Sequence, residues 1–132
     1  MKYLIFLLAL TSAPSYSQDE SFRNEIVGTW VVGRSDEYFN KEWFTTQYFA
    51  DGTALYKQFE TRECISPVLI IKGAWSIKGG KLINTVLSSS GDYDVPVGMV
   101  FVDNIVELNS GKMVLFTDTN RTAYREKHET CI

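Results

Sequence analysis

Short runs in which apolar and polar residues alternate dominate the chain after residue 25. In the run 68–77, for example, Leu69, Ile71 and Trp75 share one face, while Lys72 and Ser76 lie on the other. A period of two residues is that of a β-strand with one buried face, and helical periodicity is nearly absent. The pattern predicts a helical turn over 19–25 and strands at 26–32, 43–50, 53–61, 68–77, 82–87, 95–108 (one strand bent at Asp103-Asn104, or two), 113–117 and 121–127.

Tight-turn sequences separate several of these runs. Asp51-Gly52 and Gly79-Gly80 can take the positive φ of a two-residue primed hairpin turn, and Asn109-Ser110-Gly111 is a third hairpin signal. Consecutive hairpins without a long crossover favour an up-and-down antiparallel sheet, and closing about eight strands into a barrel removes both exposed edges. The expected fold is therefore all-β, a single antiparallel up-and-down β-barrel. A two-sheet sandwich, the alternative, would need longer connections.

The first residues have the pattern of a secretory signal peptide. Met1-Lys2-Tyr3 gives a positive start, residues 4–10 are apolar, and Ser15-Tyr16-Ser17 places small residues before a cleavage position. We therefore expect a signal peptide over 1–17 and one barrel domain over 18–132, in the periplasm or outside the cell. No later run approaches the length of a membrane span, so no integral membrane segment is expected.

The two cysteines of the chain, Cys64 and Cys131, are expected to form a disulfide, because export would place them in an oxidising compartment. A metal site is not expected, because these cysteines and His128, the only histidine, lack the spacing of metal ligands. No cofactor is expected either.

Two stretches resemble a known family. Gly28-Thr29-Trp30 is similar to the Gly-x-Trp signature that lipocalins carry on their first strand. The sequences YFADGT (48–53) and GAWSIKGGKL (73–82) resemble the pattern of small bacterial lipocalin-like domains, in which an aromatic residue and Asp-Gly-Thr are followed by a second Gly-x-Trp, a hairpin and Lys-Leu. The resemblance implies a small lipocalin-like barrel, although residues 117–119 match the second lipocalin motif only loosely and no C-terminal helix follows.

The resemblance also implies how one end of the barrel is closed. In lipocalins the first-strand tryptophan packs across the closed end, and an arginine of the last strand lies against it. Here Trp30 would form the base, and Arg121 or Arg125 would cover it, which adds roughly 1 kcal/mol for a guanidinium on an indole. Gly28 lies two residues earlier on the same face, where its missing side chain leaves room for a large neighbour.

The aromatic residues, three Trp, seven Tyr and eight Phe, can line a pocket or fill the barrel completely. Across the Asp51-Gly52 turn, the more apolar and therefore inward face is expected to pair Phe44, Thr46 and Tyr48 with Leu55, Lys57 and Phe59. A shift in register of one residue would reverse this assignment.

Lys57 would then either meet an acidic head group of a ligand, a role open also to Arg125, or lie at the open rim with its ammonium in water. For Trp75 two interpretations also stay open: its side chain packs in the core, or it contacts a ligand. The expected ligand-binding residues are Phe44, Tyr48, Lys57, Phe59 and Trp75.

Catalytic patterns are absent from the sequence. There is no Gly-x-Ser-x-Gly, and the acids at 36–37 and at 92 and 94 are interpreted as solvated loop residues. The net charge of −3 and the scattered basic residues exclude an electrostatic nucleic-acid surface. We expect a non-catalytic monomer that binds a small, partly apolar or amphiphilic molecule. The alternative is a protein-binding module of the periplasmic inhibitor or toxin-immunity type, with the polar loops 34–40 and 88–94 as its epitope.

Overall fold

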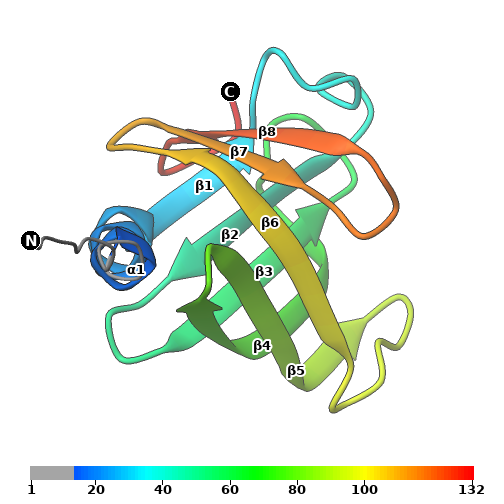
Figure 1. Cartoon of the computed structure of the whole chain (residues 1–132). Helices are drawn as coiled ribbons and strands as arrows, with labels where there is room; N and C mark the ends of the chain where they lie inside the picture. Colours follow the sequence, from blue (N-terminus) through cyan, green and yellow to red (C-terminus); the bar gives the residue numbers. More distant parts are fainter. Residues whose placement is uncertain (1–13) are drawn as a thin grey trace, which may run out of the picture.

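The computed structural model describes residues 14–132, which form an antiparallel barrel that closes on itself (Figure 1). The strands follow one another around the barrel in sequence order, and the first pairs with the last to close the ring. This confirms the predicted fold class. The elements are α1 (Pro14–Ile26), β1 (Gly28–Val32), β2 (Trp43–Tyr48), β3 (Thr53–Phe59), β4 (Pro67–Lys78), β5 (Lys81–Gly91), β6 (Val100–Leu108), β7 (Lys112–Phe116) and β8 (Thr122–Lys127).

Three predicted boundaries are wrong. Ile26 ends α1 and does not begin the first strand. Residues 88–91 were expected in a polar loop, but β5 continues through them because β4 is twelve residues long and supplies backbone partners that far. Residues 103–104, expected at a break, lie inside β6, and the preceding residues 95–99 are outside the strand.

Helix α1 closes one end of the barrel and is longer than the predicted turn. Phe22 and Ile26, near its C-terminal end, are buried against side chains that project inward from the strands. Burial under the helix removes these side chains from water, which stabilises the helix and the barrel end together. We call this buried cluster the base; its other members are Trp30, Tyr48, Ala54, Ile77, Leu82, Leu108, Met113, Leu115 and Ala123.

Polar contacts fix α1 on the turn between β4 and β5. The buried carboxylate of Asp19 accepts hydrogen bonds from the backbone N–H groups of Gly79 (2.7 Å) and Gly80 (2.8 Å). Arg23 Nη2 donates to the carbonyl oxygen of Ile77 at 2.8 Å. The helix is therefore held in place by side chains on successive turns.

Residues 1–13 of the expected signal peptide lie outside the described residues. Helix α1 begins at Pro14, before the expected cleavage position after Ser17. The hydrogen bonds to the β4–β5 turn come from Asp19 and to β4 from Arg23, both after that position. Cleavage after Ser17 would therefore leave these contacts in place.

Gly28 lacks a side chain at a point that Lys127 fills. Its φ is +136°, and a Cβ there would lie 2.6 Å from Lys127 Cε. Lys127 is the strand partner of Trp30, and its ammonium lies 5.3 Å from the Trp30 ring centroid and donates to the carbonyl of Glu25 at 3.2 Å. The glycine of Gly-x-Trp therefore makes room for a lysine that ties β8 to the end of α1.

The predicted arginine cover on Trp30 is wrong. Lys127, not an arginine, is opposite Trp30 in the β1–β8 register. The guanidinium of Arg125 lies over the ring of Phe44, 4.8 Å from its centroid, and that of Arg121 lies over Tyr38 at 4.2 Å. Both arginines lie farther from the base along the chain than Lys127 does, because β8 runs toward the base.

The predicted register between β2 and β3 is wrong by one residue. A two-residue turn was expected, but Phe49 N–H donates to the Thr53 carbonyl (2.9 Å), so residues 50–52 all belong to the turn. Only Gly52 has positive φ there (89°). Lys57 consequently pairs with Thr45, on the outer face, and Phe59 lies on that face too.

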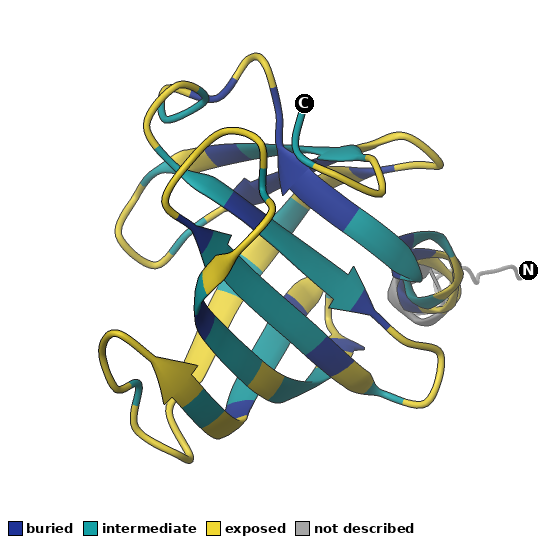
Figure 2. Cartoon of the chain, turned by 180° about the vertical axis from the view of Figure 1, so that it is seen from behind, coloured by how far each residue is buried: buried dark blue, intermediate teal, exposed yellow. Residues whose placement is uncertain are grey.

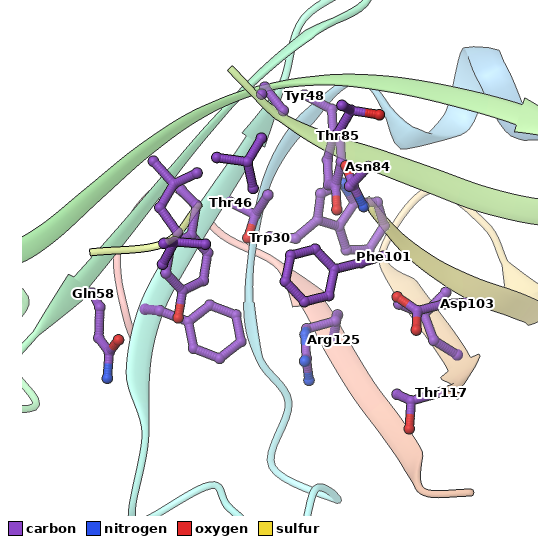
Figure 3. A pocket seen from close by; sticks show the side chains of 18 of the residues that line it. Trp30, Thr46, Tyr48, Gln58, Asn84, Thr85, Phe101, Asp103, Thr117 and Arg125 are labelled. Atoms are coloured by element: carbon purple, nitrogen blue, oxygen red, sulfur yellow. The ribbon is translucent and has the colours of Figure 1, made fainter. Parts of the chain in front are cut away.

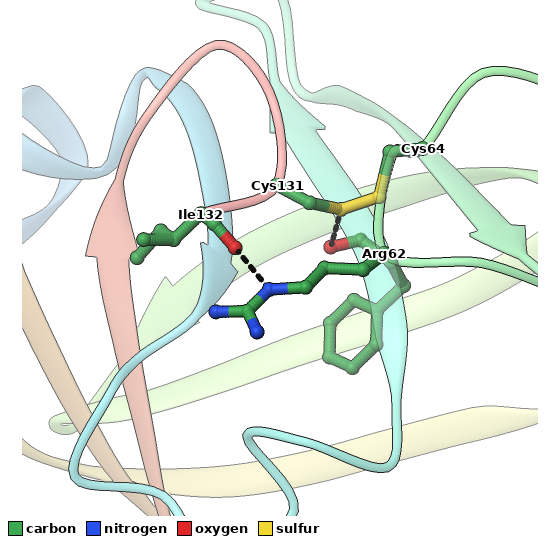
Figure 4. The surroundings of a disulfide bond; sticks show 5 residues. Arg62, Cys64, Cys131 and Ile132 are labelled. Atoms are coloured by element: carbon green, nitrogen blue, oxygen red, sulfur yellow. Dashed lines mark hydrogen bonds between the residues drawn. A yellow bond between two sulfur atoms is a disulfide. The ribbon is translucent and has the colours of Figure 1, made fainter.

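The C-terminal segment, residues 128–132, crosses the outside of β1 toward the start of β2 (Figure 4). His128 N–H donates to the carbonyl of Thr29 at 3.1 Å, and Cys131 Sγ lies 3.9 Å from the carbonyl oxygen of Phe44. The expected disulfide between Cys64 and Cys131 is confirmed, with their Cα atoms 5.9 Å apart.

The covered outer face explains why β1 is buried along its last three residues (Figure 2). Val31 points away from the barrel interior, yet only 1% of its surface is exposed. Cys131 and Ile132 border the same small depression on the outer surface as Val31 and Trp43. Arg62 Nε also donates to the Ile132 carbonyl at 3.1 Å, so the loop that carries Cys64 is tied to the C-terminal segment twice.

Removing the disulfide should lower the free energy of unfolding by about 3 kcal/mol, because the bond closes a long loop of the unfolded chain. The two cysteines are 67 residues apart. The measurement is urea unfolding of the oxidised protein and of a Cys64→Ser/Cys131→Ser variant. Two free thiols in the unfolded, non-reduced wild type would contradict the bond directly.

Candidate binding cavity

The barrel encloses a cavity of about 490 Å³, whose lining is drawn in Figure 3. All eight strands contribute side chains to it, together with residues 93, 95 and 117–119. Those last residues belong to the connections after β5 and β7, at the end opposite α1, so the cavity opens there. Its volume lies in the range of small-molecule sites, roughly 300–1,000 Å³.

The cavity is apolar at its base and more polar toward its mouth. Trp30, Met113 and Leu115 belong both to the base and to the lining. The mouth carries the hydroxyl and carboxyl groups of residues 117–119, and Gln58 adds an amide to the wall. Such a gradient suits a molecule with an apolar body and one polar end.

Two tyrosines in the wall have perturbed hydroxyl groups. Burial raises the pKa of Tyr48 to about 12, although a hydrogen bond with Asn84 and the charge of Arg125 act in the opposite direction. Burial also raises the pKa of Tyr56. Both phenols are therefore neutral near pH 7, where they can donate a hydrogen bond to a ligand but cannot act as phenolate bases.

A buried ion cluster lies beside the cavity wall. The Asp36 carboxylate, whose side chain is 0% exposed, pairs with Arg125 at 3.2 Å and with Arg121. It also accepts backbone N–H bonds from Tyr124 (2.8 Å) and Tyr38 (2.9 Å). With these four donors, the Asp36 carboxylate joins the connection between β1 and β2 to β8 and to Arg121 just before it. It also orients Arg125, which lines the cavity.

The titration of this cluster follows from its contacts. Burial by itself raises the pKa of Asp36, but the N–H groups of Tyr38 and Tyr124 and the two guanidinium charges together lower that pKa below 3.8. Burial lowers the pKa of Arg125, against the attraction of Asp36. The cluster is therefore an ion pair across the physiological pH range.

Two further acids line the cavity, Asp103 from β6 and Asp118 from the turn after β7. Burial raises the pKa of Asp103, the charge of Asp118 raises it further, and Arg125 opposes both. Within residues 14–132, neither carboxylate takes part in a hydrogen bond or an ion pair with another side chain or backbone group.

The structure brings together only part of the predicted site. Phe44, Tyr48 and Arg125 line the cavity, as does Trp30 from the base, whereas Lys57, Phe59 and Arg121 do not. Trp75 is outside the lining; it packs edge-on against Tyr48 with ring centroids 6.0 Å apart, and its Nε1 donates to the carbonyl of Phe49 at 2.9 Å.

Sequence reasoning missed the acids of the site. Asp36 was interpreted as a solvated loop residue, but it is buried. Residues 88–91, expected in a polar loop, belong to β5 and are largely exposed. One signal for a buried acid was available in the sequence. Arg121 and Arg125 are four residues apart, so in a strand both side chains would lie on one face. Two neighbouring positive charges there would need a nearby carboxylate.

Comparison of the chain with protein-family models, curated proteins and solved structures finds no match. In residues 14–132, no cluster of three or more His, Cys, Asp or Glu side chains is placed to hold a metal ion. None of the helical structure in that range has the length and hydropathy needed to cross a membrane.

Proposed function

We propose that this is an exported, non-catalytic, lipocalin-like protein that binds one small, partly apolar molecule inside its barrel. The observation that carries the proposal is the cavity of about 490 Å³ with an apolar base and a polar mouth. A barrel filled by its own aromatic side chains would leave no such volume. The buried Trp30 at the closed end supports the lipocalin-like comparison.

Other features support the remaining parts of this proposal. A disulfide persists in oxidising compartments, which favours export. The phenols of the wall are neutral, and Arg125 is held by Asp36, so these groups are suited to recognition and not to proton transfer.

Binding of an uncharged apolar probe tests the proposal. N-phenyl-1-naphthylamine should become fluorescent on entering the cavity and should quench Trp30 by energy transfer. Thr46→Trp, which fills the cavity from β2, should weaken probe binding by about tenfold or more. Thr45→Trp, on the outer face of the same strand, is the matched control and should bind like the wild type.

Circular dichroism of both variants establishes that the barrel is intact. Absence of probe binding to the folded wild type, or equal loss in the two tryptophan variants, would contradict a binding cavity.

A further inference from the structure

Of the charged groups that face the cavity, some have an ion-pair partner and others do not. Among the described lining residues these groups are Arg125, Asp103 and Asp118. The positive charge of Arg125 is already paired with Asp36 at 3.2 Å. Arg121, the other cation of that cluster, pairs with Asp36 and with Glu37 at 3.3 Å. An acidic ligand would therefore have to compete with Asp36 for its partner.

The two acids of the lining are in the opposite situation. Asp103 from β6 and Asp118 from the turn after β7 both line the cavity, and among the described residues neither forms a hydrogen bond or an ion pair, although the charge of Arg125 acts on Asp103. Arg125 is balanced by Asp36, so Asp103 and Asp118 leave the lining of the cavity with an excess of negative charge. Asp103 is half-buried, whereas Asp118 is exposed at the mouth. Burying a carboxylate without an ion pair is unfavourable, and a cation beside Asp103 would relieve this while also meeting the charge of Asp118.

The surrounding walls suit an organic cation and not a bare metal ion. Phe101 lies two residues before Asp103 in β6, so the two side chains are on the same inward face, and both line the cavity. Aromatic faces attract ammonium groups. Trp30 and Met113, deeper in the cavity, offer apolar surface that only a ligand with an apolar body would use.

We propose that the ligand is a cationic amphiphile, an organic amine whose ammonium group lies between Asp103 and Asp118 and whose apolar body extends toward Trp30. This inference rests on the proposed function and adds the charge of the ligand. It replaces the acidic head group, which the sequence left open as one alternative, because Lys57 is on the outer face and Arg125 already has a counter-ion.

Three ligands with the same ten-carbon chain test the charge preference: decylamine, decanol and decanoate near pH 7. Each displaces N-phenyl-1-naphthylamine in competition below its aggregation concentration. Decylamine should displace the probe at a concentration about tenfold or more below that of decanol, and decanoate should require more than decanol. Equal potency of decylamine and decanoate would overturn the inference.

Acid-to-amide variants locate the effect. The displacing concentration of decanol divided by that of decylamine, measured within each variant, should fall to within about threefold of unity in Asp103→Asn/Asp118→Asn. Asp92→Asn, an exposed acid in the neighbouring connection that does not line the cavity, is the control and should keep the wild-type ratio. A ratio unchanged in the double variant would overturn the inference.

The outcomes separate the two proposals. If decanol displaces the probe as well as decylamine does, the cavity binds apolar molecules and only the charge inference fails. If neither the probe nor any ten-carbon ligand binds the folded protein, the proposed function fails and the charge inference fails with it.

Discussion

Replacing Trp30 by alanine is expected to lower the free energy of unfolding by about 4 kcal/mol, because truncation of a fully buried indole leaves a large cavity in the base. Trp30 is 0% exposed, and its Nε1 donates to the carbonyl of Ile26 at 2.8 Å. Its ring also lies under the ammonium of Lys127. One substitution would thus remove packing from the strands and a hydrogen bond from the end of α1.

Urea unfolding followed by circular dichroism measures this loss. Trp75→Ala is the matched control, because Trp75 ends a similar Gly-x-Trp unit but is only half-buried and lies outside the cavity lining. The stability lost in this variant should be less than half as large. A second measurement is proteolysis of α1, which should accelerate in Trp30→Ala. If Trp30→Ala loses no more than Trp75→Ala, the indole is not the centre of the base.

Replacing Asp36 by asparagine should cost about 4 kcal/mol, because Arg121 and Arg125 would keep their positive charges without the carboxylate that balances them. Asparagine has nearly the same volume, so the change tests charge and not packing. Arg125 is the more affected, since its side chain is 14% exposed and water cannot replace the lost partner.

Glu37→Gln provides the control for this prediction. Glu37 also pairs with Arg121, but its side chain is 65% exposed, so its removal should cost less than about 1 kcal/mol. Both variants are compared with the wild type by urea unfolding at pH 7. Similar losses in the two variants would show that the burial of Asp36 does not matter.

The Asp36 carboxylate also makes a predictable contribution to acid stability. Its folded pKa is lower than the ordinary value of 3.8, so its contribution is fully present above that value and is lost as the pH falls through the lowered folded pKa. The difference in unfolding free energy between wild type and Asp36→Asn should therefore shrink as the pH falls from about 5 to about 2. A difference independent of pH would contradict the ionised carboxylate.

Local patterns were sufficient for the fold because each strand pairs with its neighbour in sequence. Alternation located the strands, and turn residues located the hairpins. The register between β2 and β3 failed because one additional residue in the turn shifts every partner. The apolar Phe59 was also misleading: it lies on the outer face yet is buried, opposite Trp43 and close to where the C-terminal segment passes.

The candidate site was less predictable because it depends on groups distant in sequence. Asp36 pairs with Arg121 and Arg125 only after the barrel has closed, and Asp103 and Asp118 come to line one cavity only through the β6–β7 pairing. No local spacing reports either encounter. The inward orientation of Phe44 and Tyr48 was predicted correctly, because the face of β2 alone determines it.

The pairing of β1 with β8, which closes the barrel, constrains the order in which the protein can fold. Every other strand pair joins strands that are consecutive in the chain, so each of these hairpins can form locally, without the rest of the barrel. Trp30 and Lys127 are partners in the β1–β8 pair, so the chain must bring its two ends together, an entropically costly closure that slows folding. Until β8 arrives, α1 has no complete base to cover, so we expect it to dock late in folding.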